Sequence, residues 1–101
     1  MRLVTLLSVL GVFLVSGTTF AAIDCSRAKS NVDKLICSSS SLGLAQEQMA
    51  LSFRKAMRRG VDLGELKRTQ EDWYEHVRNA CNDVPCLMKA FDERGAELDN
   101  Y

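Results

Sequence analysis

Four cysteines, at positions 25, 37, 81 and 86, constrain the fold of this 101-residue chain more than any other feature. The chain is long enough for one domain at most. A domain of this size buries too little apolar surface to be secure on its core alone, and disulfides are the usual remedy in an oxidising compartment. The cysteines therefore raise two questions, which are whether the chain is exported and how its thiols pair.

The N-terminus has the three-part pattern of a secretory signal peptide. Arg2 supplies a positive start, residues 3–15 form an uncharged apolar run, and Thr19 and Ala21 put small residues where a signal peptidase reads them. The apolar run spans 13 residues, whereas a membrane-spanning helix needs about 20. The pattern therefore indicates a cleaved leader rather than a membrane anchor.

Cleavage is expected after Ala21 or Ala22, which divides the chain into a signal peptide of residues 1–21 and a domain of residues 22–101. No membrane span is expected in that domain. It keeps 12 basic and 13 acidic residues, because Arg2 is the one charged residue that the leader removes. This balance offers no basic surface for nucleic acid. We expect a periplasmic or secreted protein.

The first half of the domain predicts two helices. Ser30 followed by Asp33 resembles a capping box, so a short helix is expected over residues 31–37. The serine run at residues 38–41 can cap a longer helix, which Gly60 ends. Apolar side chains of that longer helix recur at the three- and four-residue steps of one helix face: Leu42, Ala45, Met49, Phe53 and Ala56.

The second half predicts two more helices, separated by a turn at residues 82–85 in which Pro85 suits a helix start. Asp62, with Glu65 three residues later, caps the first of them. Its stripe comprises Leu63, Leu66, Gln70, Trp73, Val77 and Ala80. The last helix carries Leu87, Met88, Phe91 and Leu98. Since strand-like alternation is absent from the sequence, the predicted fold class is all-α, a small helical bundle or hairpin of three to four helices.

Four cysteines allow three pairings, and sequence distance favours the local one. Cys25 and Cys37 bracket the first short helix, and Cys81 and Cys86 bracket the last turn. The crossed pairings would require the two ends of the domain to lie together in a specific way. A zinc site competes for the same residues, but the spacings do not match paired zinc knuckles, so no metal or other cofactor is expected. Two disulfides, Cys25–Cys37 and Cys81–Cys86, are therefore predicted.

Catalytic interpretations are weaker than structural ones for the polar residues of the third helix. His76 is the only imidazole, and Asp72 precedes it by four residues, but no serine stands at an obvious third position. Glu71, Asp72 and Glu75 are flanked by basic residues, namely Lys67, Arg68 and Arg78, which favours ion pairing on an exposed helix face over acid–base work. We expect no enzymatic activity.

Three other residues could hold a ligand but have better structural interpretations. Trp73 and Phe53 lie on apolar stripes and are expected to pack in the core. Arg78 lies one turn before Cys81 and is expected to tie the end of the third helix. The sequence therefore predicts a small, stapled helical domain that acts by surface recognition.

A series of different short motifs, at definite spacings from one another, covers nearly all of residues 22–101. They are Ile23-Asp24-Cys25, Val32-Asp33-Lys34-Leu35-Ile36-Cys37-Ser38, Leu42 with Phe53, Gln70-Glu71-Asp72-Trp73, Arg78-Asn79-Ala80-Cys81 and Cys86-Leu87. Together they resemble the LprI-like lysozyme-inhibitor family. The resemblance implies an exported, disulfide-bonded helical domain in which Asp24, Phe53, Trp73 and Arg78 are structural motif residues.

The chain departs from the family pattern at two places. Ala45-Gln46 stands where the family has a Leu-Asp pair, and Phe53 stands where it has tyrosine. The first departure removes a carboxylate, and with it any role that depends on that group.

The resemblance also implies a protein partner, namely a lysozyme that the domain would inhibit by occlusion. The alternative is a binding module of the same fold with another partner, such as an envelope stress factor, an immunity protein or a host-facing effector. Three loops are candidate contact surfaces: residues 38–41, residues 58–65 with Arg58, Arg59, Asp62 and Glu65, and residues 82–85. The helical stripes are compatible with either a monomer or a dimer.

Overall fold

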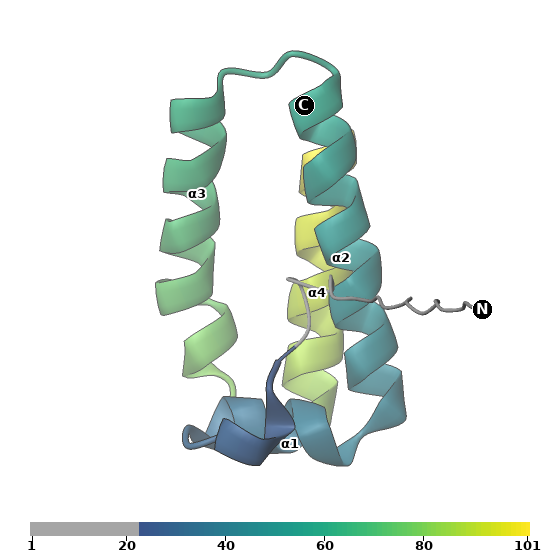
Figure 1. Cartoon of the computed structure of the whole chain (residues 1–101), viewed down its shortest axis with the longest axis vertical. Coiled ribbons are helices and arrows are strands. Elements are labelled where there is room, and N and C mark those ends of the chain that lie inside the picture. The colour runs from purple at the N-terminus through teal and green to yellow at the C-terminus, as the bar shows by residue number, and fades with distance from the viewer. Residues whose placement is uncertain (1–22) are drawn as a thin grey trace, which may run out of the picture.

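The computed structural model describes residues 23–101, and every regular element in that range is a helix (Figure 1). The predicted signal peptide lies outside the described residues. In chain order the elements are η2 (Cys25–Arg27), α1 (Asn31–Ser38), α2 (Ser40–Arg58), α3 (Leu63–His76), η3 (Arg78–Ala80) and α4 (Val84–Asp99). Both predicted disulfides are formed, Cys25–Cys37 and Cys81–Cys86. The predicted fold class, a small all-α domain with two local disulfides, is confirmed.

Each of the four α-helices begins at a residue whose side chain caps it. The caps are Ser30, Ser39, Asp62 and Asp83, and each side-chain oxygen accepts a hydrogen bond, 2.9–3.2 Å long, from the backbone N–H three residues on. These bonds satisfy N–H groups that have no partner inside the helix. At the other end of α2, Gly60 takes a φ of 86°, which glycine adopts without strain, so the helix ends where it was predicted to end.

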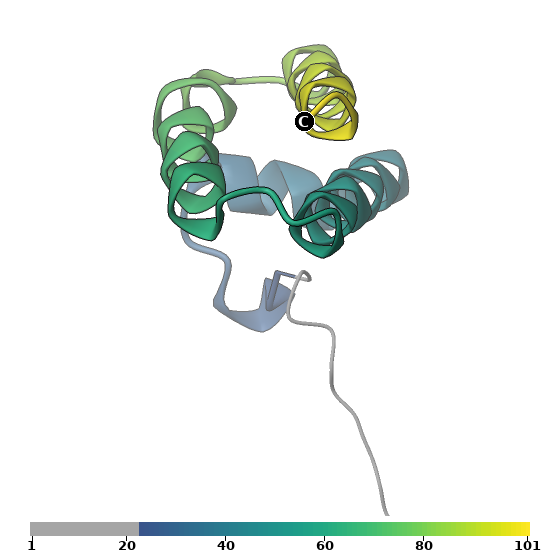
Figure 2. The same cartoon turned by 90° about the horizontal axis from the view of Figure 1, so that it is seen from above.

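The long helices α2, α3 and α4 run along the molecule, and the short helix α1 lies crosswise at one end (Figures 1 and 2). The most extensive contact between helices is that of α2 with α4. The core draws on all four helices, and its largest fully buried aliphatic side chains are Leu42, Leu66, Leu87 and Leu98. Trp73 joins this core as predicted, with its ring 5.7 Å from that of Phe91.

The predicted extent of α3 is wrong, because the helix ends at His76 rather than near Ala80. The Val77 N–H makes the last helical hydrogen bond, to the Trp73 carbonyl at 2.9 Å, and the chain then turns into η3, which carries Arg78 to α1. Val77 and Ala80 are consequently exposed rather than part of the apolar stripe. Leu63, at the first turn of α3, is also exposed, so the buried stripe of this helix is shorter than the sequence pattern indicates.

The end of the molecule opposite α1 is held by Arg59. Its Nη2 donates a 2.7 Å hydrogen bond to the carbonyl of Leu98, and its Nε donates to the carbonyl of Tyr101 at 3.4 Å. The last turn of α4 has no basic residue of its own. Arg59, which directly follows α2, therefore places a positive charge at the negative C-terminal end of α4.

Candidate functional site

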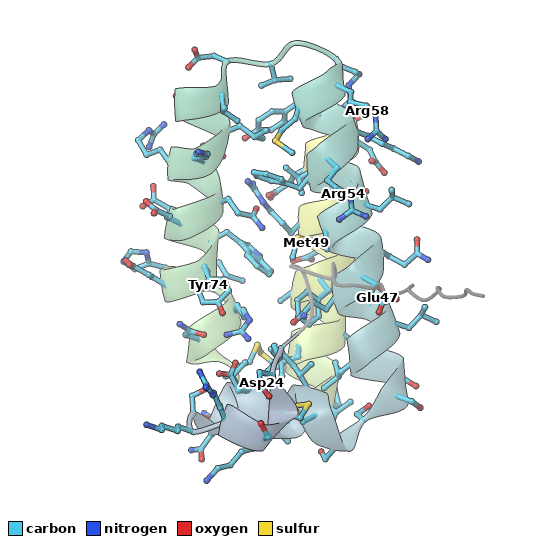
Figure 3. The ribbon with its side chains drawn as sticks, viewed as in Figure 1. Asp24, Glu47, Met49, Arg54, Arg58 and Tyr74 are labelled. Atoms are coloured by element: carbon cyan, nitrogen blue, oxygen red, sulfur yellow. A yellow bond between two sulfur atoms is a disulfide. The ribbon has the colours of Figure 1, made fainter. Side chains whose placement is uncertain are left out.

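Both disulfides brace the same end of the bundle. Cys25–Cys37 joins η2 to the last turn of α1, with 5.7 Å between Cα atoms, and Cys81–Cys86 closes the turn before α4, with 5.5 Å. The two stapled segments meet, because Arg78 of η3 forms an ion pair with Asp33 of α1 (Figure 3 shows this end at its base). We call α1, residues 38–41 and residues 81–86 the braced end.

Arg78 is the tie between the two stapled segments. Its side chain is 2% exposed; Nη2 donates to Asp33 Oδ1 at 2.7 Å and Nη1 to Asn79 Oδ1 at 2.6 Å. The guanidinium carbon lies 4.2 Å from the centre of the Tyr74 ring. These contacts tie η3 to α1 rather than closing the end of α3. The second half of the predicted capping box is wrong, because the Asp33 carboxylate turns to Arg78.

The three candidate contact loops do not form one surface. Residues 38–41 and 82–85 lie at the braced end, whereas residues 58–65 lie at the opposite end of the long helices (Figure 1). Ser38 and Asn82 line the same open hollow, of about 520 Å³, with three residues of α1: Asn31, Lys34 and Leu35. The structure therefore separates one loop from the other two.

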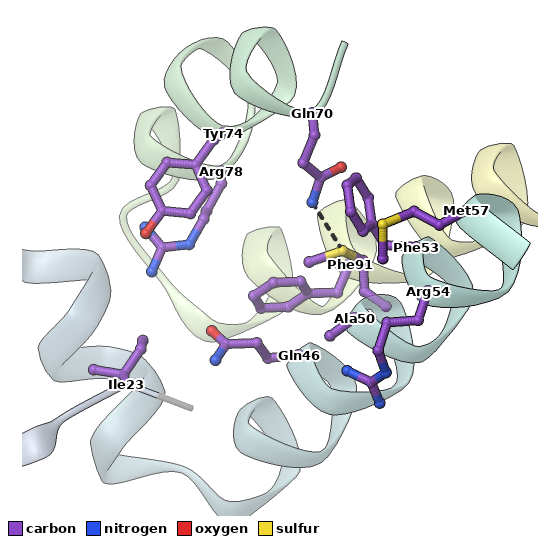
Figure 4. A pocket seen from close by; sticks show the side chains of 11 residues that line it. Ile23, Gln46, Ala50, Phe53, Arg54, Met57, Gln70, Tyr74, Arg78 and Phe91 are labelled. Carbon is purple, nitrogen blue, oxygen red and sulfur yellow. Dashed lines mark hydrogen bonds between the residues drawn. The ribbon is translucent and has the colours of Figure 1, made fainter. Parts of the chain in front are cut away.

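A second cavity, which we call the groove, lies between α2 and α3 and has a volume of about 360 Å³ (Figure 4). Its apolar lining comprises Ile23, Met49, Ala50, Phe53, Met57 and Phe91. Phe53 is half-buried, so its predicted core role is only partly correct. Met57 and Tyr74 are exposed, 39% and 43% respectively, and line the groove as well.

Two polar side chains that join α3 to the rest of the core were not recognised as partners from the sequence. Arg94 of α4 is 4% exposed; its Nε donates to Gln70 Oε1 at 2.8 Å and its Nη2 to Thr69 Oγ1 at 3.0 Å. Gln70 Nε2 in turn donates to the sulfur of Met49 at 3.2 Å. The sequence did contain a sign of this contact, because each residue is a polar side chain on an apolar helix face. Gln70 interrupts the apolar stripe of α3. Arg94 lies three residues after Phe91 and four before Leu98, on the apolar face of α4.

The geometry around His76 does not assemble an acid–base pair. Its Nδ1 lies 3.0 Å from the backbone carbonyl of Asp72, while the Asp72 carboxylate pairs with Arg68 at 3.4 Å. Arg68 also pairs with Glu65 at 3.0 Å, and the hydrogen bond and charge of that carboxylate raise the pKa of Arg68. All of these side chains are exposed, as expected for ion pairing on a solvated helix face.

Two features are absent from residues 23–101, namely a metal-binding cluster and a helix able to cross a membrane. In this part of the chain, no group of three or more His, Cys, Asp or Glu side chains is placed to hold a metal ion. None of its helices combines the length and the apolar character that crossing a membrane requires.

The remaining motif residues either cap a helix or are buried. Asp24 caps η2, accepting hydrogen bonds from the backbone N–H and hydroxyl of Ser26 at 3.1 and 2.6 Å. Ala45 and Gln46 are both buried, and Gln46 lines the groove.

Comparisons were made with protein-family models, with curated proteins and with solved structures. None of the three found a match for this chain.

Proposed function

We propose that this protein is an exported binding protein that inhibits a lysozyme by occlusion, without chemistry of its own. The observation that carries the proposal is the braced end, where two disulfides and a part-buried ion pair hold two adjacent loops. The disulfides also favour a periplasmic or secreted location, because they persist in oxidising compartments. The choice of a lysozyme as the target comes from the LprI-like resemblance.

A rigid surface is what an occluding inhibitor needs. Ordering loops on binding lowers affinity, so a surface that is already held in place loses less on association. Inhibitor interfaces of this kind move little between the free and bound states. At the braced end, the hollow shared by Lys34, Ser38 and Asn82 can receive a protruding side chain of the partner.

The test is a cell-wall lysis assay with animal-type, goose-type and bacterial muramidases, together with a direct binding measurement. The oxidised protein should inhibit at least one class. Lys34→Glu and Asn82→Arg, at the braced end, should each weaken that inhibition by about tenfold or more, as the loss of one central contact does.

Lys67→Glu is the matched control, since it makes the same charge change on an exposed residue of α3, away from the braced end. It should inhibit like the unmodified protein. Failure to inhibit any of the three classes would refute the lysozyme target. Equal losses from Lys34→Glu and Lys67→Glu would refute the braced end as the contact surface.

A binding module with a different partner is the second candidate, and the charge balance favours it. Animal-type lysozymes are commonly basic, yet residues 22–101 carry 12 basic and 13 acidic residues, which provides little electrostatic steering. Recovery of one non-lysozyme partner from envelope extract, lost with Lys34→Glu and kept with Lys67→Glu, would support this candidate.

A further inference from the structure

The hollow at the braced end, of about 520 Å³, is lined by both stapled segments. One of its lining residues, Asn82, comes from the loop that the Cys81–Cys86 disulfide closes. Since each segment is held by a disulfide, the backbones around the hollow are in place before a partner binds. The other lining residues share one face of α1, because they are spaced at the three- and four-residue steps of a helix: Asn31, Lys34, Leu35 and Ser38.

Three polar side chains of the hollow have no partner within residues 23–101. They are the ammonium of Lys34 and the carboxamides of Asn31 and Asn82, which form neither a hydrogen bond nor an ion pair there. The hydroxyl of Ser38 donates to the carbonyl of Leu35 at 2.9 Å, so it remains only as an acceptor. The hollow therefore presents one positive charge and two carboxamide groups with their N–H donors unused.

The charge of Lys34 is not balanced by a neighbouring acid. Among the described residues that line the hollow, Lys34 is the only charged one. The adjacent Asp33 pairs with Arg78 at 2.7 Å. Asp83 is held at the start of α4, where it accepts from the backbone N–H of Cys86 at 2.9 Å. Both nearby carboxylates are thus engaged elsewhere, and the hollow favours an anionic guest.

The lining also distinguishes one kind of anion from others. A carboxylate only accepts hydrogen bonds, which matches an ammonium and two carboxamide donors. A phosphate group carries a charge of about −1.5 to −2, more than one lysine balances. Leu35 is half-buried and is the one apolar residue of the described lining, so it offers a contact for a short methylene stem but little to a large apolar side chain.

We infer that the hollow at the braced end receives a glutamate side chain of the partner protein. The carboxylate accepts hydrogen bonds from Lys34, Asn31 and Asn82, and the methylene groups lie against Leu35. The inference rests on the proposed function in one respect, since it takes the braced end as the contact surface. It does not require that the partner be a lysozyme.

The test uses N-acetylglutamate N-methylamide, with N-acetylglutamine N-methylamide as an uncharged probe of the same shape. Binding is followed by nitrogen–proton correlation NMR, in which the side-chain amide groups of Asn31 and Asn82 report on the hollow directly. The glutamate probe should shift both signals. It should bind about three- to fivefold more tightly than the glutamine probe, which is what an ion pair open to solvent contributes.

Variants then locate the charge that is recognised. Lys34→Gln should remove the preference for the glutamate probe, and Lys34→Arg should retain most of it. Lys29→Gln is the matched control, because Lys29 is an exposed lysine two residues before α1 that does not line the hollow. It should leave the preference unchanged. Lys34 is exposed as well, and circular dichroism establishes that each variant is folded.

Three results would overturn the inference. The first is equal affinity for the two probes, or no binding of either, and the second is an equal effect of Lys34→Gln and Lys29→Gln. The third is equally tight binding of N-acetylalanine, whose only carboxylate is terminal, since it would assign the hollow to a chain end.

The lysis assay separates this inference from the proposed function. Inhibition of a muramidase by a protein that does not prefer the glutamate probe would refute the glutamate contact and leave the inhibitor proposal standing. A clear preference for the glutamate probe, without inhibition of any of the three muramidase classes, would support the contact and refute only the lysozyme target.

Discussion

The carboxylate of Asp33 lies 2.7 Å from Nη2 of Arg78, which joins α1 to the segment that follows α3 across 45 positions of sequence. The arginine side chain is 2% exposed and the aspartate side chain 30% exposed. Replacing Asp33 by alanine leaves the guanidinium buried without its charge partner. Asp33→Ala should therefore lower the free energy of unfolding by about 3 kcal/mol, measured by urea denaturation.

Glu93→Ala is the control for that experiment. It also removes a carboxylate from an ion pair, that of Glu93 with Lys89 at 3.1 Å, but both side chains are largely exposed. An exposed pair contributes about 1 kcal/mol or less. Similar losses for the two variants would contradict the structural role assigned to Arg78.

Removal of the Trp73 ring should destabilise the domain severely. The side chain is 7% exposed and contacts Phe91 of α4. Trp73→Ala is expected to cost about 3–5 kcal/mol, which can unfold a domain of this size. Leu63→Ala truncates an exposed side chain of the same helix and should change stability by about 0.5 kcal/mol or less. A stable Trp73→Ala protein would show that the ring does not hold α3 to α4.

The disulfides should contribute unequally. Thiol titration in denaturant should find no free thiol in the oxidised protein, since all four cysteines are paired. The Cys25–Cys37 bridge closes the longer loop, with a separation of 12 residues against 5. In the chain-entropy account, replacing the pair by serines should cost about 3 kcal/mol for the longer loop and about 2 kcal/mol for the shorter. The reverse order would contradict this account.

Two glycines of α2 and its end should respond oppositely to alanine. Gly60 has a φ of 86°, so a Cβ introduces strain there, and Gly60→Ala should lower stability by about 1 kcal/mol. Gly43 is within the helix, and a Cβ built there meets nothing within 4 Å. Gly43→Ala should raise stability by about 0.5–1 kcal/mol. Thermal unfolding of the two variants side by side measures the contrast.

Local chemistry made much of the fold predictable. Ser30, Asp62 and the serine run mark helix starts because their oxygens satisfy N–H groups of the first turn. The local disulfides followed from sequence distance. The end of α3 was not predictable in the same way, because nothing near Val77 signals a stop. That helix ends where Arg78 reaches Asp33, a contact set by the tertiary structure.

The candidate sites were less accessible to sequence reasoning. Residues 38–41 and 82–85 were identified one by one, but their adjacency depends on α1 lying across the bundle. The groove was not predicted, because the sequence pattern places Phe53 on the same apolar stripe as the core residues. Phe53 is only half-buried because α2 and α3 are spaced apart at this point. The pairing of Gln70 with Arg94 shows that polar interruptions of two stripes can be read together as a contact.

Arg59 has a consequence for how the domain unfolds. The carbonyls of Leu98 and Tyr101, at the C-terminal end of α4, accept hydrogen bonds from Arg59 at the end of α2, roughly forty residues earlier in the chain. The end of α4 is not complete by itself, so its last turn should fray as soon as α2 detaches. Amide hydrogen exchange at these two helix ends should then proceed through a single cooperative opening event, in which α2 and α4 protect each other or are lost together.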